Sequence, residues 1–180
     1  FLGLEEDEQQ PFGQWLAPVP RSSLASTPEE AHLTLAHDPS GGPGNWCLSM
    51  HAPGSERLDL IGPFLIEKRH PLLEGLSLGG VVWSTSKEAV LPGTPLISAG
   101  NIPILTEQLL PTRRVYHMNI DWSRSSLQRT PDWPILLDNL ARLRRRELPG
   151  ALSNTLAIGE DFHFQADGEA SYVLDGPDGR

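Results

Sequence analysis

Short apolar segments separated by glycine- and proline-rich turns run along most of the chain and predict many short strands. Residues 95–105 (PLISAGNIPIL) predict a hairpin, because Gly100 and Asn101 stand at its centre between two apolar runs. Gly62-Pro63 interrupts another apolar stretch and predicts a break there. Further strand-like segments are residues 15–20, 46–51, 81–83, 155–158, 162–165 and 170–174.

A regular alternation of side chains occupies residues 114–120 (RVYHMNI). One set of alternate positions contains Val115, His117 and Asn119, and the other contains Tyr116, Met118 and Ile120. Successive side chains of a strand point to opposite faces, so this segment predicts a strand with one face buried.

The clearest helical pattern begins at Asp132, a residue type that commonly caps helix N-termini. Pro134 falls in the first turn, where proline is tolerated, and Pro149-Gly150 ends the helix. A shorter helix is expected after Ser26 or Thr27, with Pro28 in its first turn. The apolar stripe of the longer helix contains Trp133, Leu136, Leu137 and Leu140, with Leu143 or Arg144 as its last position.

These elements predict an α+β fold, or a truncated α/β fold, with a mixed sheet and one to three helices. We expect one mixed α/β domain over residues 1–149. Residues 150–180 have a β pattern and predict either the start of a small β-domain or an added hairpin. The first residue, Phe1, and the turn-forming end DGPDGR indicate a piece of a longer protein.

Composition removes several functional classes. The formal net charge of −9 argues against a nucleic-acid binder, which needs a basic face for phosphates. One cysteine excludes an internal disulfide and any CxxC metal site. The histidines are scattered, no HExxH or Walker phosphate loop is present, and we therefore predict no metal and no cofactor.

Cys47, with His51 four residues later, is the one candidate for nucleophilic chemistry. The segment NWCLSMH lacks the glycine-flanked elbow that presents a nucleophile on a sharp turn. If the segment is a strand, the two residues share a face but lie about 13 Å apart along it. A buried structural thiol is the favoured interpretation, and we predict no catalytic residues.

Positive charge concentrates at the end of the predicted helix, although the chain as a whole is acidic. Residues 113–147 hold eight arginines against four acids. Arg142, Arg145 and Arg146, together with Trp122, are the predicted interaction residues, facing an acidic protein partner or lipid head groups. The default interpretation of the arginines is a solvated helix end whose charges complement the helix dipole, with no partner. Asp121, with Ser123 and Ser125-Ser126, is expected to cap a turn.

Several segments in one order carry a resemblance to a known family. They are HPLLEGLSLGGVVWS, the turn PLISAG, RRVYHMNIDWSRSSLQRTPDWPILLDNLARL with the following Pro-Gly, and IGEDFHFQ with YVLDGPDG. Together they resemble the region downstream of the von Willebrand factor A domain in bacterial aerotolerance-regulator (Bat-like) membrane proteins. The likeness covers roughly residues 69–180, and Ser125 to Leu140 is its most specific part.

The resemblance implies an amidotransferase-like fold without catalytic residues, because the nucleophile-elbow cysteine and the His-x-Glu of true amidotransferases are absent. It further implies a membrane-anchored parent and a soluble portion outside the cytoplasm. We therefore expect a non-catalytic structural or protein-interaction module with protein partners. The alternatives are a hydrolase or amidotransferase remnant using Cys47, and a carbohydrate- or peptide-binding sandwich.

Overall fold

A computed structural model describes residues 2–3, 23, 25–27, 30–37, 44–51, 56–151, 158–159, 161, 163–166 and 173. Its centre is a seven-stranded mixed sheet with the strand order β1-β2-β3-β9-β8-β7-β5. The strands β1, β2, β3 and β9 are parallel, whereas β9, β8, β7 and β5 pair antiparallel. The bounds are β1 Leu2–Gly3, β2 Thr34–Ala36, β3 Trp46–His51, β5 Leu65–Ile66, β7 Thr94–Ala99, β8 Ile102–Leu110 and β9 Arg113–Asn119.

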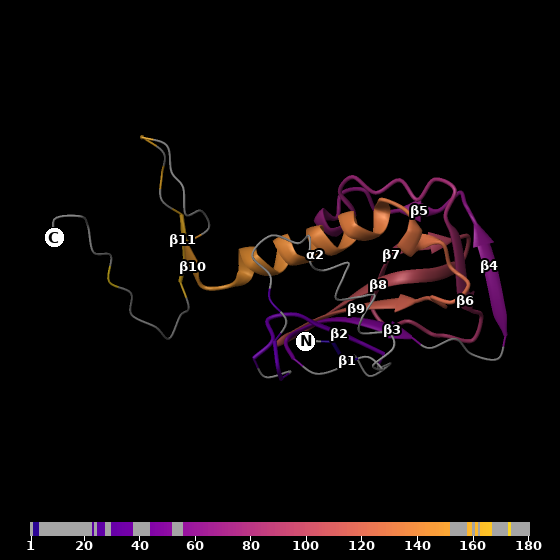
Figure 1. Cartoon of the computed structure of the whole chain (residues 1–180), viewed down its shortest axis with the longest axis horizontal. Coiled ribbons are helices and arrows are strands. Elements are labelled where there is room, and N and C mark those ends of the chain that lie inside the picture. Colours follow the sequence, from indigo (N-terminus) through magenta and orange to yellow (C-terminus); the bar gives the residue numbers. More distant parts are fainter. Residues whose placement is uncertain are drawn as a thin grey trace.

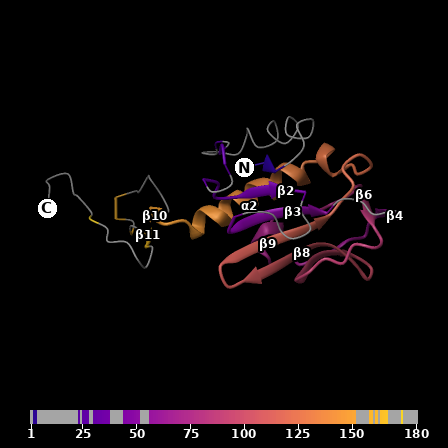
Figure 2. The ribbon, with the colours of Figure 1, turned by 90° about the horizontal axis from the view of Figure 1, so that it is seen from below.

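One long helix, α2 (Asp132–Glu147), lies across one face of this sheet (Figures 1 and 2). Two short 3-10 turns, η1 (Pro71–Leu73) and η2 (Leu127–Arg129), pack against it. Together with the sheet they enclose the main core. Its largest fully buried side chains include Trp83, Trp133, Tyr116, Leu48, Met50, Leu72, Leu105 and Met118.

A second, two-stranded sheet joins β4 (Arg57–Ile61) and β6 (Val82–Ser86) at one end of the main sheet (Figure 1). Side chains that follow or end β9 bind the open edge of β6. Asn119 Oδ1 accepts from the Ser86 amide at 3.0 Å, and Ser125 Oγ accepts from the Ser84 amide at 3.0 Å. Buried backbone amides need partners, so these side chains fix where the small sheet sits.

Near the carboxyl end of the chain, β10 (Gly150–Ala151) pairs antiparallel with β11 (Phe164–Gln165). This pair lies beyond the end of α2 and away from the main sheet in Figure 1. Residues 155–157 and 170–172 lie outside the described residues, as do 15–20 and Pro28. The strands predicted at 15–20, 155–158 and 170–174, and the short helix after Ser26 or Thr27, therefore stay predictions.

The predicted α+β class, with its mixed sheet, helix and short carboxyl-terminal β segment, is confirmed. The hairpin with its bend at Gly100-Asn101 is also confirmed, because β7 and β8 pair on either side of it. The apolar stripe of α2 faces the core as expected: Trp133, Leu136, Leu137 and Leu140 are buried and Leu143 is partly buried against them.

Two local predictions were wrong. Residues 114–120 are not half-buried, since every β9 side chain from Val115 to Asn119 is buried on both faces of the sheet. Asp132 does not cap α2 and is itself the first helical residue, after Pro131. Its Oδ1 instead accepts from the backbone amides of Ser77 (2.9 Å) and Leu78 (3.3 Å). These two hydrogen bonds anchor a neighbouring loop to the helix.

Candidate functional site

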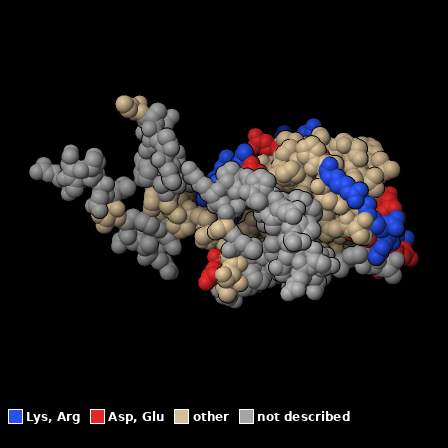
Figure 3. Space-filling model, viewed as in Figure 1, with Lys and Arg blue, Asp and Glu red and all other residues tan. Residues whose placement is uncertain are grey.

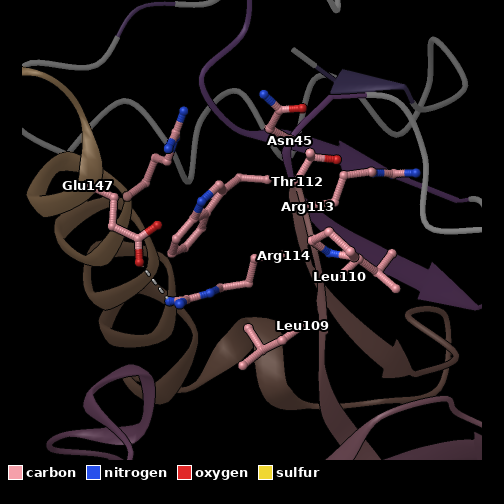
Figure 4. A pocket seen from close by; sticks show the side chains of 10 residues that line it. Asn45, Leu109, Leu110, Thr112, Arg113, Arg114 and Glu147 are labelled. Carbon is pink, nitrogen blue, oxygen red and sulfur yellow. Dashed lines mark ion pairs between the residues drawn. The ribbon is translucent and has the colours of Figure 1, made fainter. Parts of the chain in front are cut away.

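A cavity of about 310 Å³ lies between the last turns of α2 and the turn that joins β8 to β9 (Figure 4). The helix contributes Arg144 and Glu147, and the amino end of β9 contributes Arg113 and Arg114. The remaining lining residues are Asn45, Trp46, Leu109, Leu110, Pro111 and Thr112. Among the described lining residues, three arginines against one carboxylate make the lining strongly cationic.

The indole of Trp46 makes cation–π contacts with two of these guanidinium groups. The Arg114 Cζ atom is 4.6 Å from the ring centroid, and the Arg144 Cζ atom is 5.6 Å from it. Cation–π contacts of this kind hold each guanidinium in place, and its N–H groups can still donate hydrogen bonds in the guanidinium plane. Trp46 is itself buried as the first residue of β3, so the platform is rigid.

Arg144 is fixed at its Nε atom, which donates to the His32 carbonyl at 2.8 Å. Burial lowers the pKa of Arg144, and the nearby Glu147 carboxylate acts in the opposite direction. An arginine keeps its proton in proteins even so. The cavity therefore holds a permanent positive charge at this position.

Arg114 lies between two carboxylates, one beneath it and one on the helix. Its Nε atom is 3.6 Å from Glu107 Oε1, and its Nη1 atom is 3.0 Å from Glu147 Oε1. Glu107 is mostly buried on β8 and also accepts from the Tyr116 hydroxyl at 3.0 Å. A hydrogen bond from His70 is the main cause that lowers the pKa of Glu107. Glu107 thus orients Arg114 from the sheet side.

Arg113 extends from the opposite side of β9, away from Arg114 (Figure 4), and its Nε atom donates to the Gly44 carbonyl at 3.0 Å. On the face seen in Figure 3, blue and red side chains gather near the end of α2 and around β4. Near β4, Arg124 forms an ion pair with Asp59.

None of the predicted interaction residues is among the residues that line this cavity. Arg142 and Arg146 are exposed on the last turns of α2, and Arg142 pairs with Asp138 one turn earlier. Arg145 is partly exposed, and none of the three lines the cavity. Trp122 is partly buried: its ring lies 4.7 Å from that of Trp133, and its Nε1 donates to Met50 Sδ at 3.1 Å.

The sheet face away from α2 carries a second group of polar side chains, in which His51 and His117 are buried and Gln108 is partly buried. His51 Nε2 is 3.0 Å from His117 Nδ1, and His117 Nε2 is 3.0 Å from Gln108 Oε1. Because the Gln108 oxygen accepts, the His117 proton belongs on Nε2, and Nδ1 accepts from His51. Desolvation, followed by the neighbouring His51 and Arg113, lowers the pKa of His117 to about 4. His117 is therefore neutral at physiological pH.

Cys47 shares this face and is fully buried in the interior of β3, packed with Ala36 and Val115. The predicted buried thiol is confirmed. A nucleophilic cysteine needs solvent access and a cationic neighbour, and this position offers neither access nor a turn that would present the thiol. His51, on the same strand, is engaged with His117.

The turn after β9 is capped by Asp121 as predicted. Its Oδ1 accepts from the Ser123 amide at 3.0 Å and from the Ser123 hydroxyl at 2.6 Å. Ser125 and Ser126 have a different role from the one expected, because their hydroxyls accept from β6 amides of the small sheet.

Sequence reasoning missed both the cavity and the histidine pair. The adjacent arginines at 113 and 114, directly before an alternating strand, were a signal for the cavity, but its partner Trp46 is far away in the sequence. The alternation of Cys47, Ser49 and His51 matched that of Val115, His117 and Asn119, yet only parallel pairing of β3 with β9 brings them together.

No protein-family model matches the chain, and neither does any curated protein or any solved structure. In the part of the chain that the structure describes, the search for a helix long and apolar enough to cross a membrane found none.

Proposed function

We propose that this chain is a non-catalytic protein-interaction module of a larger, membrane-anchored bacterial protein, and that a partner protein binds at the arginine-lined cavity. The observation that carries the proposal is the placement of both Arg114 and Arg144 against the ring of Trp46. Fixed guanidinium groups in a concave, aromatic setting are suited to binding an anionic group of a partner.

The chemistry of the cavity favours binding over catalysis. Its arginines keep their protons at neutral pH and so cannot exchange one with a substrate. Glu147 is the one carboxylate among the described lining residues, and it is already ion-paired with Arg114.

The membrane-anchored parent and the placement of this module outside the cytoplasm rest on the likeness of residues 69–180 to the Bat-like proteins. The proposal for protein partners draws on the cavity as well. A net charge of −9 makes a nucleic-acid partner unsuitable. The positive charge of the cavity instead suits an acidic segment of a protein. The cavity is locally positive, whereas the chain as a whole is negative.

Binding of a fluorescent oligoglutamate peptide, followed by fluorescence anisotropy, tests the proposal. Arg144→Gln and Arg114→Gln should each weaken binding about tenfold, since each removes a charge-assisted hydrogen-bond donor of the cavity. Arg142→Gln is the matched control, because it removes the same charge from the same helix outside the cavity.

The control should change the affinity less than about twofold at physiological salt, because exposed charges are largely screened there. Equal losses in all three variants would show that the peptide responds to diffuse charge. That result, or an absence of binding to the unaltered protein, would overturn the cavity as the binding site.

A further inference from the structure

We infer that Glu147 is an intramolecular competitor of the ligand. Its carboxylate is paired with the Arg114 guanidinium in the free protein and is displaced by a carboxylate of an acidic, partly apolar peptide segment. The inference rests on the proposed function and adds both the ligand chemistry and a means of control.

The two carboxylates around Arg114 are held very differently. Glu107 is mostly buried in the sheet and has three partners, Arg114, His70 and Tyr116. Glu147 projects from the helix across the cavity to Arg114 (Figure 4), and 43% of its side chain is exposed. Removal of Glu147 from Arg114 therefore leaves the guanidinium oriented by Glu107, with Nη1 open to an incoming oxygen.

The position of Glu147 in the helix makes it easy to displace. It is the last residue of α2, where the carbonyl end of the helix dipole disfavours a negative charge. A partly exposed ion pair contributes little free energy, because solvent screens it and two long side chains must be ordered. The contact thus masks the charge of Arg114 without holding the cavity shut.

The rim of the cavity indicates what kind of segment would replace Glu147. Leu109 and Leu110 line it and are 64% and 40% exposed, which is unusual for leucines on a strand. A peptide segment with a carboxylate next to an apolar side chain fits this arrangement. Its carboxylate would bind Arg114 and Arg144, and its apolar side chain would pack against the two leucines. A lipid head group would bring only the anion to a recessed site, so a peptide is the better match.

The test compares Glu147→Gln with Asp138→Asn. Both remove one negative charge from α2, but Asp138 pairs with Arg142 outside the cavity. The probe is an N-acetylated peptide of alternating glutamate and leucine, titrated by calorimetry. Glu147→Gln should tighten binding about two- to fivefold, the value of one exposed ion pair, and Asp138→Asn should leave it within about 1.5-fold.

A second readout follows the Arg114 side chain directly by nitrogen-15 NMR. Its guanidinium signal should move on adding the peptide to Glu147→Gln, where Nη1 gains a carboxylate partner, and should move less in the unaltered protein, where one carboxylate replaces another. Phosphatidylglycerol vesicles provide the comparison with lipid. Vesicle binding that is sensitive to Arg144→Gln, without peptide binding, would overturn the peptide assignment.

The failure of this inference differs from the failure of the proposed function. Equal affinities in Glu147→Gln and Asp138→Asn, with binding still lost in Arg144→Gln, would reject displacement and leave the cavity as a binding site. No peptide binding by the unaltered protein and by Glu147→Gln would reject both.

Discussion

His117 should make the protein lose stability in mild acid, between about pH 6.5 and pH 4. The imidazole is buried and neutral, with its two nitrogens occupied by His51 and Gln108. Its pKa falls from 6.5 in the unfolded chain to about 4 in the folded protein. A base with a lowered folded pKa binds its proton more readily when unfolded, so its destabilising effect is absent above pH 6.5 and grows as the pH falls toward 4.

The magnitude follows from the size of this shift. Each pKa unit corresponds to about 1.4 kcal/mol, so protonation of His117 would lower the free energy of unfolding by up to about 3 kcal/mol at pH 4. The lowered pKa of Glu107 acts in a different window. Stability from that ionised carboxylate is present above its unfolded pKa, near 4.5, and is lost as the pH falls further.

The variant that isolates His117 is His117→Gln, which cannot titrate. Urea denaturation at a series of pH values from 7 to 4.5, followed by tryptophan fluorescence, gives the free energy of unfolding at each pH. The variant should be less stable at pH 7, because hydrogen bonds in the buried network are lost. Its stability should then fall much less on acidification than that of the unaltered protein.

The slope of stability against pH decides the outcome, not the stability at any one pH. His32→Gln serves as the control, because that side chain is exposed and the substitution removes a histidine without disturbing the buried pair. Parallel slopes for His117→Gln and the unaltered protein between pH 6.5 and 4.5 would refute the account of His117 as a buried neutral base.

Four further substitutions test the fold by thermal and urea denaturation. Leu136→Ala should cost about 2–5 kcal/mol, because it opens a cavity in the core, and near-normal melting would contradict the assigned helix face. Gly93→Ala should be strongly destabilising, about 3 kcal/mol or more, since φ is +95° and the added Cβ would overlap the Glu107 carbonyl. Gly100→Ala, at φ +56° with open space around it, should cost only about 1–2 kcal/mol, and equal losses would refute the clash. Asp132→Ala should cost about 1–3 kcal/mol by leaving two loop amides without their acceptor, and an unchanged urea midpoint would contradict that role.

The elements that the sequence predicted well are those whose signals are local. The bend at Gly100-Asn101 and the leucines of α2 each act over a few residues, so composition and spacing were sufficient. Asp132 shows where local rules stop. An aspartate at a helix start normally accepts a hydrogen bond from a backbone amide of the first turn. Here the carboxylate accepts from the amides of residues 77–78 instead.

The candidate site could not be predicted because its parts are distant in the sequence. Trp46 meets Arg114 only through the parallel pairing of β3 with β9, and Arg144 arrives from the far end of α2. The same pairing turns the polar positions of β9, which alternation alone assigns to solvent, into a buried hydrogen-bonded row. Interactions across an interior face leave no periodic mark that differs from that of a solvated face.

The change from antiparallel to parallel pairing at β9 has a consequence for the order of folding. The strands β7, β8 and β9 are joined by short turns, so they can pair at a small cost in loop closure. By contrast, the pair of β3 with β9 joins residues more than sixty positions apart, such as Ser49 and His117. Because contacts distant in sequence slow folding, we expect the β7–β9 meander to form early and β3 to join it late. The indole of Trp46 would then reach its two arginines only in the last stage, so that the cavity is assembled after most of the sheet.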